Sequence, residues 1–237
     1  MILGIETSTA LCGAALVQDG VMTAEEMVRS RAVHSERLMP MIQRLLEGAG
    51  MELGDLEAIA ISAGPGSYTG LRIGMATAKG LCVSSSIPLV LVSTLESIAF
   101  GSGRDDGTVC SLMVARQSEV FAAVYDLSSG GRATLLEPQA IELQDLIQRL
   151  PKTVCLTGPG VETHGQAIGE VLGDGAIVAS GLLNDPRAAA VALLGEALLK
   201  DGKTADPIDA EPMYLKVSQV DLPRRSSRRN FPTSEPV

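Results

Sequence analysis

Ala63-Gly64-Pro65-Gly66-Ser67-Tyr68-Thr69-Gly70-Leu71-Arg72-Ile73-Gly74 is the stretch that decides the fold of this 237-residue chain. It follows the apolar run 58–62 and opens a segment of helical character that extends to about Val83. A strand, a glycine-rich turn and a helix N-terminus can together bind phosphate, because free backbone N–H groups converge on one point. The stretch lacks the Lys-Ser or Lys-Thr pair of a P-loop and the glycine spacing of a dinucleotide-binding turn, so it belongs to neither class.

The residues around this stretch predict an α/β unit. Apolar runs at 2–5, 11–17 and 21–28 predict three strands, and further strands are expected at 58–62 and 89–92. Apolar residues at helical spacing predict an amphipathic helix between them: Leu38, Met41, Ile42, Leu45 and Leu46. Pro40 predicts that the regular helix begins near it or bends there.

The second half of the chain repeats this order. Strands are predicted at 108–114, 120–127, 133–136 and 153–157, a helix at 143–150, and Gly158-Pro159-Gly160 matches the earlier turn. The repeat predicts an α/β protein of two related βββαβα subdomains that face each other across a cleft. We expect subdomains at 1–100 and 101–222 and a disordered, Arg-rich tail at 223–237. Asp185 and Pro186 are expected to open a helix over 185–200, and the sequence leaves open whether it packs back on the first subdomain.

The composition argues against several classes of protein. Hydrophobic residues make up 46% and aromatic residues only 3%, so an aliphatic core is expected. No apolar run reaches the ~20 residues of a membrane span and no basic segment precedes the apolar start, so we expect a cytoplasmic protein without a signal peptide. The cysteines and histidines lack metal-binding spacing, so no metal site is expected. The net charge of −9 opposes direct contact with nucleic acid, and the arginines of the tail either touch RNA or are simply solvated.

Four strings in order resemble one known family. They are MILGIETST at 1–9, HSERLMP at 34–40, GPGSYTGLRIG at 64–74 and PLVLVSTL at 88–95. Together they resemble the bacterial TsaB (YeaZ) family, whose relatives include the Gcp-like glycoproteases of the M22 group. The duplicated unit is similar to the actin-like ATPase (ASKHA) fold, with two mixed five-stranded sheets. The resemblance is close over about residues 1–100 and looser beyond, where EPMYLK at 211–216 resembles the closing element of the family.

The resemblance implies a function in tRNA modification. TsaB proteins take part in the synthesis of N6-threonylcarbamoyladenosine (t6A) at position 37 of tRNA, as the non-catalytic partner of the catalytic subunit TsaD, with TsaE as an ATPase that joins them. The implied partners are therefore TsaD and TsaE, with tRNA reached only indirectly through the complex and no membrane contact. A homodimer is left open.

The resemblance also implies that the chain is not itself an enzyme. TsaD binds its metal through two histidines four residues apart, and Thr94 and Ile98 occupy those places here. Neither side chain replaces a neutral imidazole as a ligand, so no catalytic residue and no metal ligand is expected. The alternative is an active actin-like enzyme, either a small-molecule kinase with Glu6 as its carboxylate or a peptidase of the M22 type.

No tightly bound cofactor is expected, but the two turns are candidates for a weak contact with ATP or ADP. The candidate residues are Thr7, Ser8, Thr9, Gly64 and Gly66. Ser8 stands where actin-like kinases have glycine, and its Cβ would crowd a backbone that wraps a phosphate. The alternative is a structural turn whose hydroxyls bond nearby backbone groups, with the repeated Gly-Pro-Gly turn as part of the fold.

Two helices of the first subdomain are the candidate partner surface. Gly70, Gly74 and Ala78 share one helix face, and this face has almost no side chains, which would let another helix approach closely. Because these helices form a bundle with TsaD and support self-pairing in the TsaB family, the resemblance implies an interface of Leu38, Met41, Leu45, Gly70, Leu71, Arg72, Gly74, Met75 and Ala78. The alternative is that the close neighbour belongs to the same chain.

Overall fold

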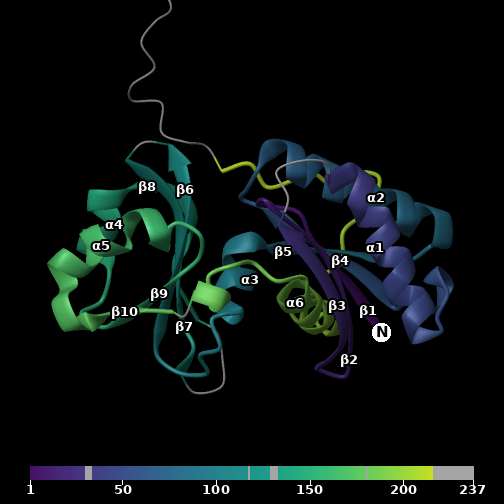
Figure 1. The fold of residues 1–237 in the computed structure, drawn as a ribbon, viewed down its shortest axis with the longest axis horizontal. Helices are drawn as coiled ribbons and strands as arrows, with labels where there is room; N and C mark the ends of the chain where they lie inside the picture. Colours follow the sequence, from purple (N-terminus) through teal and green to yellow (C-terminus); the bar gives the residue numbers. More distant parts are fainter. Residues whose placement is uncertain (30–33, 117, 129–132, 180, 216–237) are drawn as a thin grey trace, which may run out of the picture.

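Two mixed β-sheets of five strands organise the computed structural model, which describes residues 1–29, 34–116, 118–128, 133–179 and 181–215 (Figure 1). The strand order is β3-β2-β1-β4-β5 in the first sheet and β10-β9-β6-β7-β8 in the second. In each sheet three consecutive strands pair antiparallel. A later strand adds in parallel to the first of them, β4 to β1 and β9 to β6, and a last strand adds in parallel to that one. The same order and direction in both halves confirm the predicted α/β fold of two related βββαβα subdomains.

The predicted strands and helices are present, with shifted ends. The first half contains β1 (Ile2–Glu6), β2 (Leu11–Gln18), β3 (Val21–Arg29), α1 (His34–Ala49), β4 (Ala58–Gly64), α2 (Tyr68–Ser85), β5 (Leu89–Ser93) and α3 (Thr94–Phe100). The second half contains β6 (Thr108–Arg116), β7 (Glu119–Asp126), β8 (Ala133–Glu142), α4 (Leu143–Arg149), β9 (Val154–Thr157), α5 (Val161–Leu172), β10 (Ala176–Val178) and finally α6 (Ala188–Lys200). β8 extends six residues beyond the prediction because it pairs with β7 as far as Glu119.

Helices cover both faces of the first sheet. α1 and α2 lie on one face, and α6 and α3 lie on the other, between the two sheets (Figure 1). Residues of β1 alternate accordingly: Leu3 and Ile5 pack toward α1 and α2, whereas Ile2 packs toward α6. α4 and α5 cover the outer face of the second sheet, and α3 packs on its inner face. The two halves are thus joined through α3, which contacts both sheets.

Helix α1 begins earlier than Pro40 predicts. It starts at His34, and Pro40 lies inside it on the exposed side. Proline has no N–H to donate to the carbonyl four residues back, which costs one helical hydrogen bond at Glu36. The five apolar side chains of the predicted stripe are all buried against the first sheet, so tertiary packing stabilises the helix across this defect.

The helix α6 crosses back onto the first sheet, where it contacts β1, β2 and β4. Close approach depends on missing side chains, because a Cβ on Gly4 would meet the Ala188 carbonyl and a Cβ on Gly195 would meet Ala60. The predicted start at Asp185 and Pro186 is wrong, since the helix begins at Ala188.

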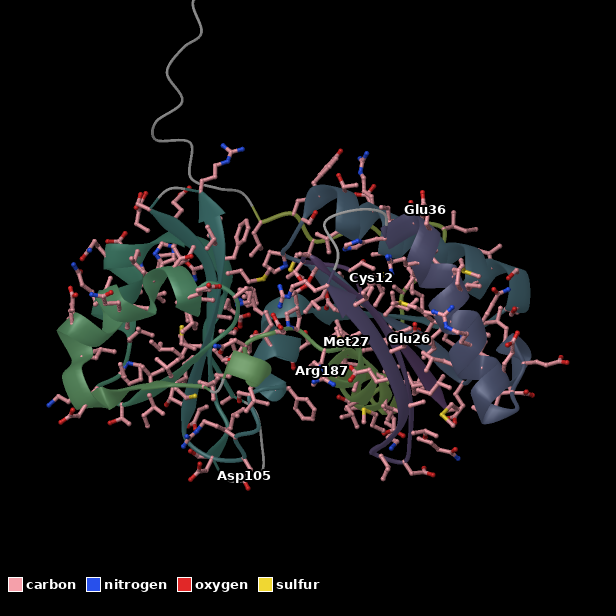
Figure 2. All side chains as sticks on the ribbon, viewed as in Figure 1. Cys12, Glu26, Met27, Glu36, Asp105 and Arg187 are labelled. Atoms are coloured by element: carbon pink, nitrogen blue, oxygen red, sulfur yellow. The ribbon has the colours of Figure 1, made fainter. Side chains whose placement is uncertain are left out.

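An ion pair and a cap from β3 explain this later start. The carboxylate of Asp185 pairs with Arg29 at 2.5 Å instead of capping the helix. Glu25 takes over the capping function: it accepts the Ala189 N–H at 3.0 Å and pairs with Arg187. Arg187 lies on the α6 side of the first sheet (Figure 2). Two ion pairs and one cap between β3 and the linker before α6 therefore fix the point at which α6 begins.

The predicted Arg-rich tail at 223–237 lies outside the described residues, as do residues 216–222. Within the described ranges, no helix combines the length and apolar character needed to cross a membrane.

Candidate functional site

A cleft of about 760 Å³ lies between the two halves. The first half lines it with the turn after β1, the start of α1 and the first turns of α2, and the second half with the ends of β6 and β7 and the turn after β9. The residues that matter chemically are Ser8, Thr9, His34, Ser67 and Thr69 on one side and Met113, Val114, Phe121 and Pro159 on the other. None of the described residues that line this cleft is Asp, Glu, Lys or Arg, so hydroxyl and apolar groups dominate it.

Glu6 closes the turn between β1 and β2 from inside. Its Oε1 accepts hydrogen bonds from the Ser8 N–H and the Ser8 hydroxyl, both at 2.5 Å. The side chain is fully buried, and its Oε2 has no partner among the described residues. Burial raises the pKa of Glu6 above its ordinary value, while its hydrogen bonds with Ser8 oppose the rise. The carboxyl thus occupies donors that a phosphate would need, and it does not line the cleft.

The turn at Gly64-Pro65-Gly66 packs directly on the turn after β1. The Ser67 N–H donates to the Ser8 carbonyl at 2.7 Å, and a Cβ on Gly66 would meet the Ser8 backbone. In the second half, the N–H of Gly160, one position earlier in the turn, donates to the Leu112 carbonyl at 2.9 Å. The repeated turn therefore holds each helix against the neighbouring strand, which favours the structural interpretation of the motif.

The five predicted nucleotide contacts do not gather at one place. Ser8, Thr9 and Gly66 line the cleft. Thr7 instead faces α2, where its carbonyl and hydroxyl lie against Gly70 and Gly74, and Gly64 lies against the Met213 carbonyl.

His34 holds the other end of the turn after β1. Its Nε2 lies 2.9 Å from the Thr9 carbonyl. Because a carbonyl only accepts, Nε2 carries the proton and donates it. This histidine, the first residue of α1, therefore ties the start of the helix to the turn after β1.

Thr94 and Ile98 are both fully buried at α3. Ile98 packs in an apolar cluster with Val109 and Met113 of β6, so this position is part of the contact between the two halves. The Thr94 hydroxyl has no partner among the described residues. In the same ranges of the chain, no group of three or more His, Cys, Asp or Glu side chains is placed to hold a metal ion.

Eight of the nine predicted interface residues are buried within the chain itself. Leu38, Met41, Leu45, Leu71 and Met75 belong to the packing of α1 and α2, and Gly70, Gly74 and Ala78 are also buried. A Cβ on Gly70 would meet the Thr7 carbonyl, and one on Gly74 would meet the Thr7 hydroxyl and Ile61. The close neighbour of the small-residue face is therefore the turn after β1, not the surface that a partner helix would need. Arg72 alone of the nine is exposed.

Arg72 belongs to an exposed cluster that the sequence did not indicate. Its guanidinium carbon lies 4.4 Å from the centroid of the Tyr68 ring, and its Nε donates to the Tyr214 hydroxyl at 3.3 Å. The two tyrosine rings are 5.5 Å apart, between centroids. Tyr214 is 142 residues from Arg72 in sequence, so only the motif EPMYLK, with its fixed tyrosine, could have drawn attention to it.

Comparison with known proteins links this architecture to tRNA modification. The family model described as "TsaD: tRNA N6-adenosine threonylcarbamoyltransferase" matches residues 28–218. The "tRNA threonylcarbamoyladenosine biosynthesis protein TsaB" of Bacillus subtilis is 32% identical over 223 residues, which cover 93% of this chain and 96% of that protein. The protein with the same description from Escherichia coli is 33% identical and covers 91% of this chain and 94% of its own length.

A solved structure shows the same fold. The structure described as YeaZ from Pseudomonas aeruginosa superimposes with a TM-score of 0.76 at 26% identity, covering 90% of this chain and 99% of that one. Sequence and fold therefore agree over most of the length of both proteins.

Proposed function

The chain belongs to the TsaB (YeaZ) family of t6A biosynthesis proteins, and from that membership we propose that it is a non-catalytic subunit that binds and activates a TsaD-type transferase. The observation that carries the proposal is the packing at α3. The resemblance to TsaD implies that Thr94 and Ile98 take the places of its metal-binding histidines, and Ile98 is fully buried in the apolar contact between the halves. An isoleucine in that position supports a scaffold whose chemistry lies in its partner.

The closed turns support the same assignment. A magnesium-bound nucleotide needs carboxylates for the metal and free N–H donors for the phosphates. Here the Glu6 carboxyl is engaged with Ser8, and the Ser67 N–H is engaged with the Ser8 carbonyl. We therefore propose that the cleft makes at most a weak contact with ATP or ADP, through Ser8, Thr9 and Gly66.

Activation is best explained by differential binding. A subunit that contributes no reacting group can still raise activity if it binds the active conformation of its partner more tightly than the inactive one. The outer face of α1 and α2 is available for this: Glu36, Met39, Arg44 and Arg72 are exposed on it. The proposed assembly also includes a TsaE-type ATPase, and it contacts tRNA only through the transferase. We further propose a cytoplasmic location, as tRNA modification would require.

Reconstitution tests the proposal directly. The TsaD and TsaE proteins of the same organism are incubated with tRNA, threonine, bicarbonate, ATP and the enzyme that supplies the threonylcarbamoyl donor, with and without this chain. We expect t6A, measured by nucleoside mass spectrometry, to fall at least tenfold when the chain is omitted. Equal output with and without it would contradict the proposal.

The rival function, an active actin-like enzyme, is tested on the chain alone. Purified protein with ATP and Mg²⁺ is expected to release no phosphate above a matched Glu6→Gln variant. Multiple turnovers that disappear in that variant would instead favour a kinase or ATPase.

A further inference from the structure

The closing segment of the described chain, residues 203–215, is hydrogen-bonded to the first half at several positions along its length. The Ala205 N–H donates to the Leu89 carbonyl at 2.8 Å, and the Met213 N–H donates to the Ala63 carbonyl at 2.6 Å. Lys79 of α2 donates to the carbonyls of Ile208 and Ala210 at 2.8 and 2.9 Å. The segment is thus part of the rigid surface of the first half, although it lies far from α2 in sequence.

Large side chains are exposed on this closing segment. Ile208 is 74% exposed, Met213 40% and Tyr214 47%, and Tyr68 at the start of α2 is 57% exposed beside them. Tyrosine, methionine and arginine are the residue types enriched in the centres of protein interfaces. Arg72 stacks on the Tyr68 ring and donates a hydrogen bond to the Tyr214 hydroxyl. These three long side chains are therefore ordered before a partner binds.

Arg72 has no ion-pair partner among the described residues: its hydrogen bond with Tyr214 raises its pKa, and Glu211 adds a weaker electrostatic attraction. Arg72 makes its one side-chain hydrogen bond to a neutral tyrosine, and no acidic side chain of the described residues forms an ion pair with it. Helix α2 carries Arg72 and Lys79 and no acidic residue, in a chain whose net charge is −9. The guanidinium is planar and lies over an aromatic ring, and the described residues make no hydrogen bond to its terminal nitrogens. Such a group matches a carboxylate in geometry as well as charge.

We propose that Tyr68, Arg72, Met213 and Tyr214 form the anchor of the partner surface and receive an acidic side chain of the TsaD-type transferase, an inference that rests on the proposed function. The closing segment is then a binding element and not only the end of the second subdomain. The anchor continues the outer face of α1 and α2, and it replaces the buried small-residue face as the site of strongest contact.

Binding to the TsaD protein of the same organism, measured by calorimetry at several salt concentrations, tests the anchor. Arg72→Ala and Tyr214→Ala are each expected to raise the dissociation constant at least tenfold. Tyr214→Phe, which removes only the hydroxyl, is expected to raise the dissociation constant about threefold. Wild-type affinity should fall as salt rises, and Arg72→Ala should lose most of that dependence.

Two controls separate the anchor from general effects. Val83→Ala changes an exposed residue at the far end of α2, and Arg149→Ala removes an exposed arginine from the second half. Both should bind as the wild type does. The melting temperature of each variant checks that the exposed substitutions leave the fold intact.

The outcomes distinguish this proposal from the function on which it rests. Wild-type binding that Arg72→Ala and Tyr214→Ala retain, with unchanged salt dependence, overturns the anchor but leaves the proposed function standing. Absence of wild-type binding overturns both. Loss of a wild-type dimer in Arg72→Ala, with the affinity for TsaD unchanged, also overturns the anchor, because its occupant would be a second copy of the chain.

Discussion

The two halves use the same Gly-Pro-Gly turn, but the helices that follow it pack differently. Counted from the turns, the positions of Gly70, Gly74 and Ala78 in α2 correspond to His164, Ile168 and Leu172 in α5. In the first half, the helix backbone lies directly against Thr7. In the second half, side chains fill the same space, and Ile168 is fully buried. Small residues in a helix thus indicated a close neighbour, and the neighbour is a turn of the same subdomain.

A second contrast concerns the strand ends on which the turns pack. Gly66 lies against Ser8 and Gly160 lies against Leu112, so Glu6 in the first half corresponds to Cys110 in the second. Both side chains, a carboxyl and a thiol, are ionisable and fully buried. The first half ends its strand with a closed polar turn, whereas the second continues β6 as an apolar strand to Arg116. The duplication therefore preserved backbone contacts while the side chains at the cleft diverged.

Filling the space beside Thr7 tests the first contrast and has the largest expected effect. Gly74→Leu should lower the free energy of unfolding by at least ~3 kcal/mol, because the new side chain meets Thr7 and Ile61. Its matched control, Ile168→Ala, should cost about 2–5 kcal/mol through a cavity and still yield a folded protein. Urea denaturation followed by circular dichroism measures both. A Gly74→Leu protein as stable as the wild type would mean that α2 is free to move away from the turn.

Removal of the Glu25 cap tests how β3 of the first sheet fixes the start of α6. Glu25→Ala should lower stability by about 1–2 kcal/mol, since it leaves the Ala189 N–H and the Arg187 guanidinium without their acceptor. Glu25→Gln retains an acceptor for the N–H and should cost less. Equal losses in the two variants would show that the ion pair, not the cap, fixes the helix start.

The pH dependence of Glu6→Gln sharpens the comparison of the two strand ends. An acid with a raised pKa in the folded state binds its proton more tightly when folded, so its contribution is present below the unfolded pKa and is lost as pH rises. Relative to the wild type, the variant should therefore gain stability from pH 4 to pH 8, with a difference within ~1 kcal/mol at pH 4. Urea titrations at each pH measure it. A difference that stays constant with pH would mean that burial does not raise the pKa of Glu6.

Thiol labelling gives the smallest and most local readout. Burial raises the pKa of Cys12 and Cys82 to about 11 and that of Cys110 to about 12, so thiolates are scarce at neutral pH. All three should react with a disulfide reagent only on unfolding. Because α3 packs against both sheets, we expect the thiols of both halves to lose protection at the same urea concentration. Separate transitions would show that the halves unfold independently.

Much of the fold could be predicted from local patterns. Hydrophobic periodicity located the strands and helices, and the repeated Gly-Pro-Gly turn revealed the duplication, because both depend on residues close in sequence. The start of α6 could not be predicted, since Glu25 on a distant strand provides the cap that Asp185 was expected to provide. The burial of the predicted partner residues could not be foreseen for a similar reason: small residues on a helix face indicate a close neighbour, but not which part of the chain it is. The partner interface itself stays a prediction.

The sequence by itself indicated the family and the duplicated α/β architecture, because motifs and residue identities are local properties. Only the tertiary structure decided which faces are free. It buried Gly70 and Gly74 against Thr7 of the chain's own turn and brought Tyr214 beside Arg72. Exposure depends on contacts between residues far apart in sequence, and for this reason the surface available to a partner could be identified only after the chain was folded.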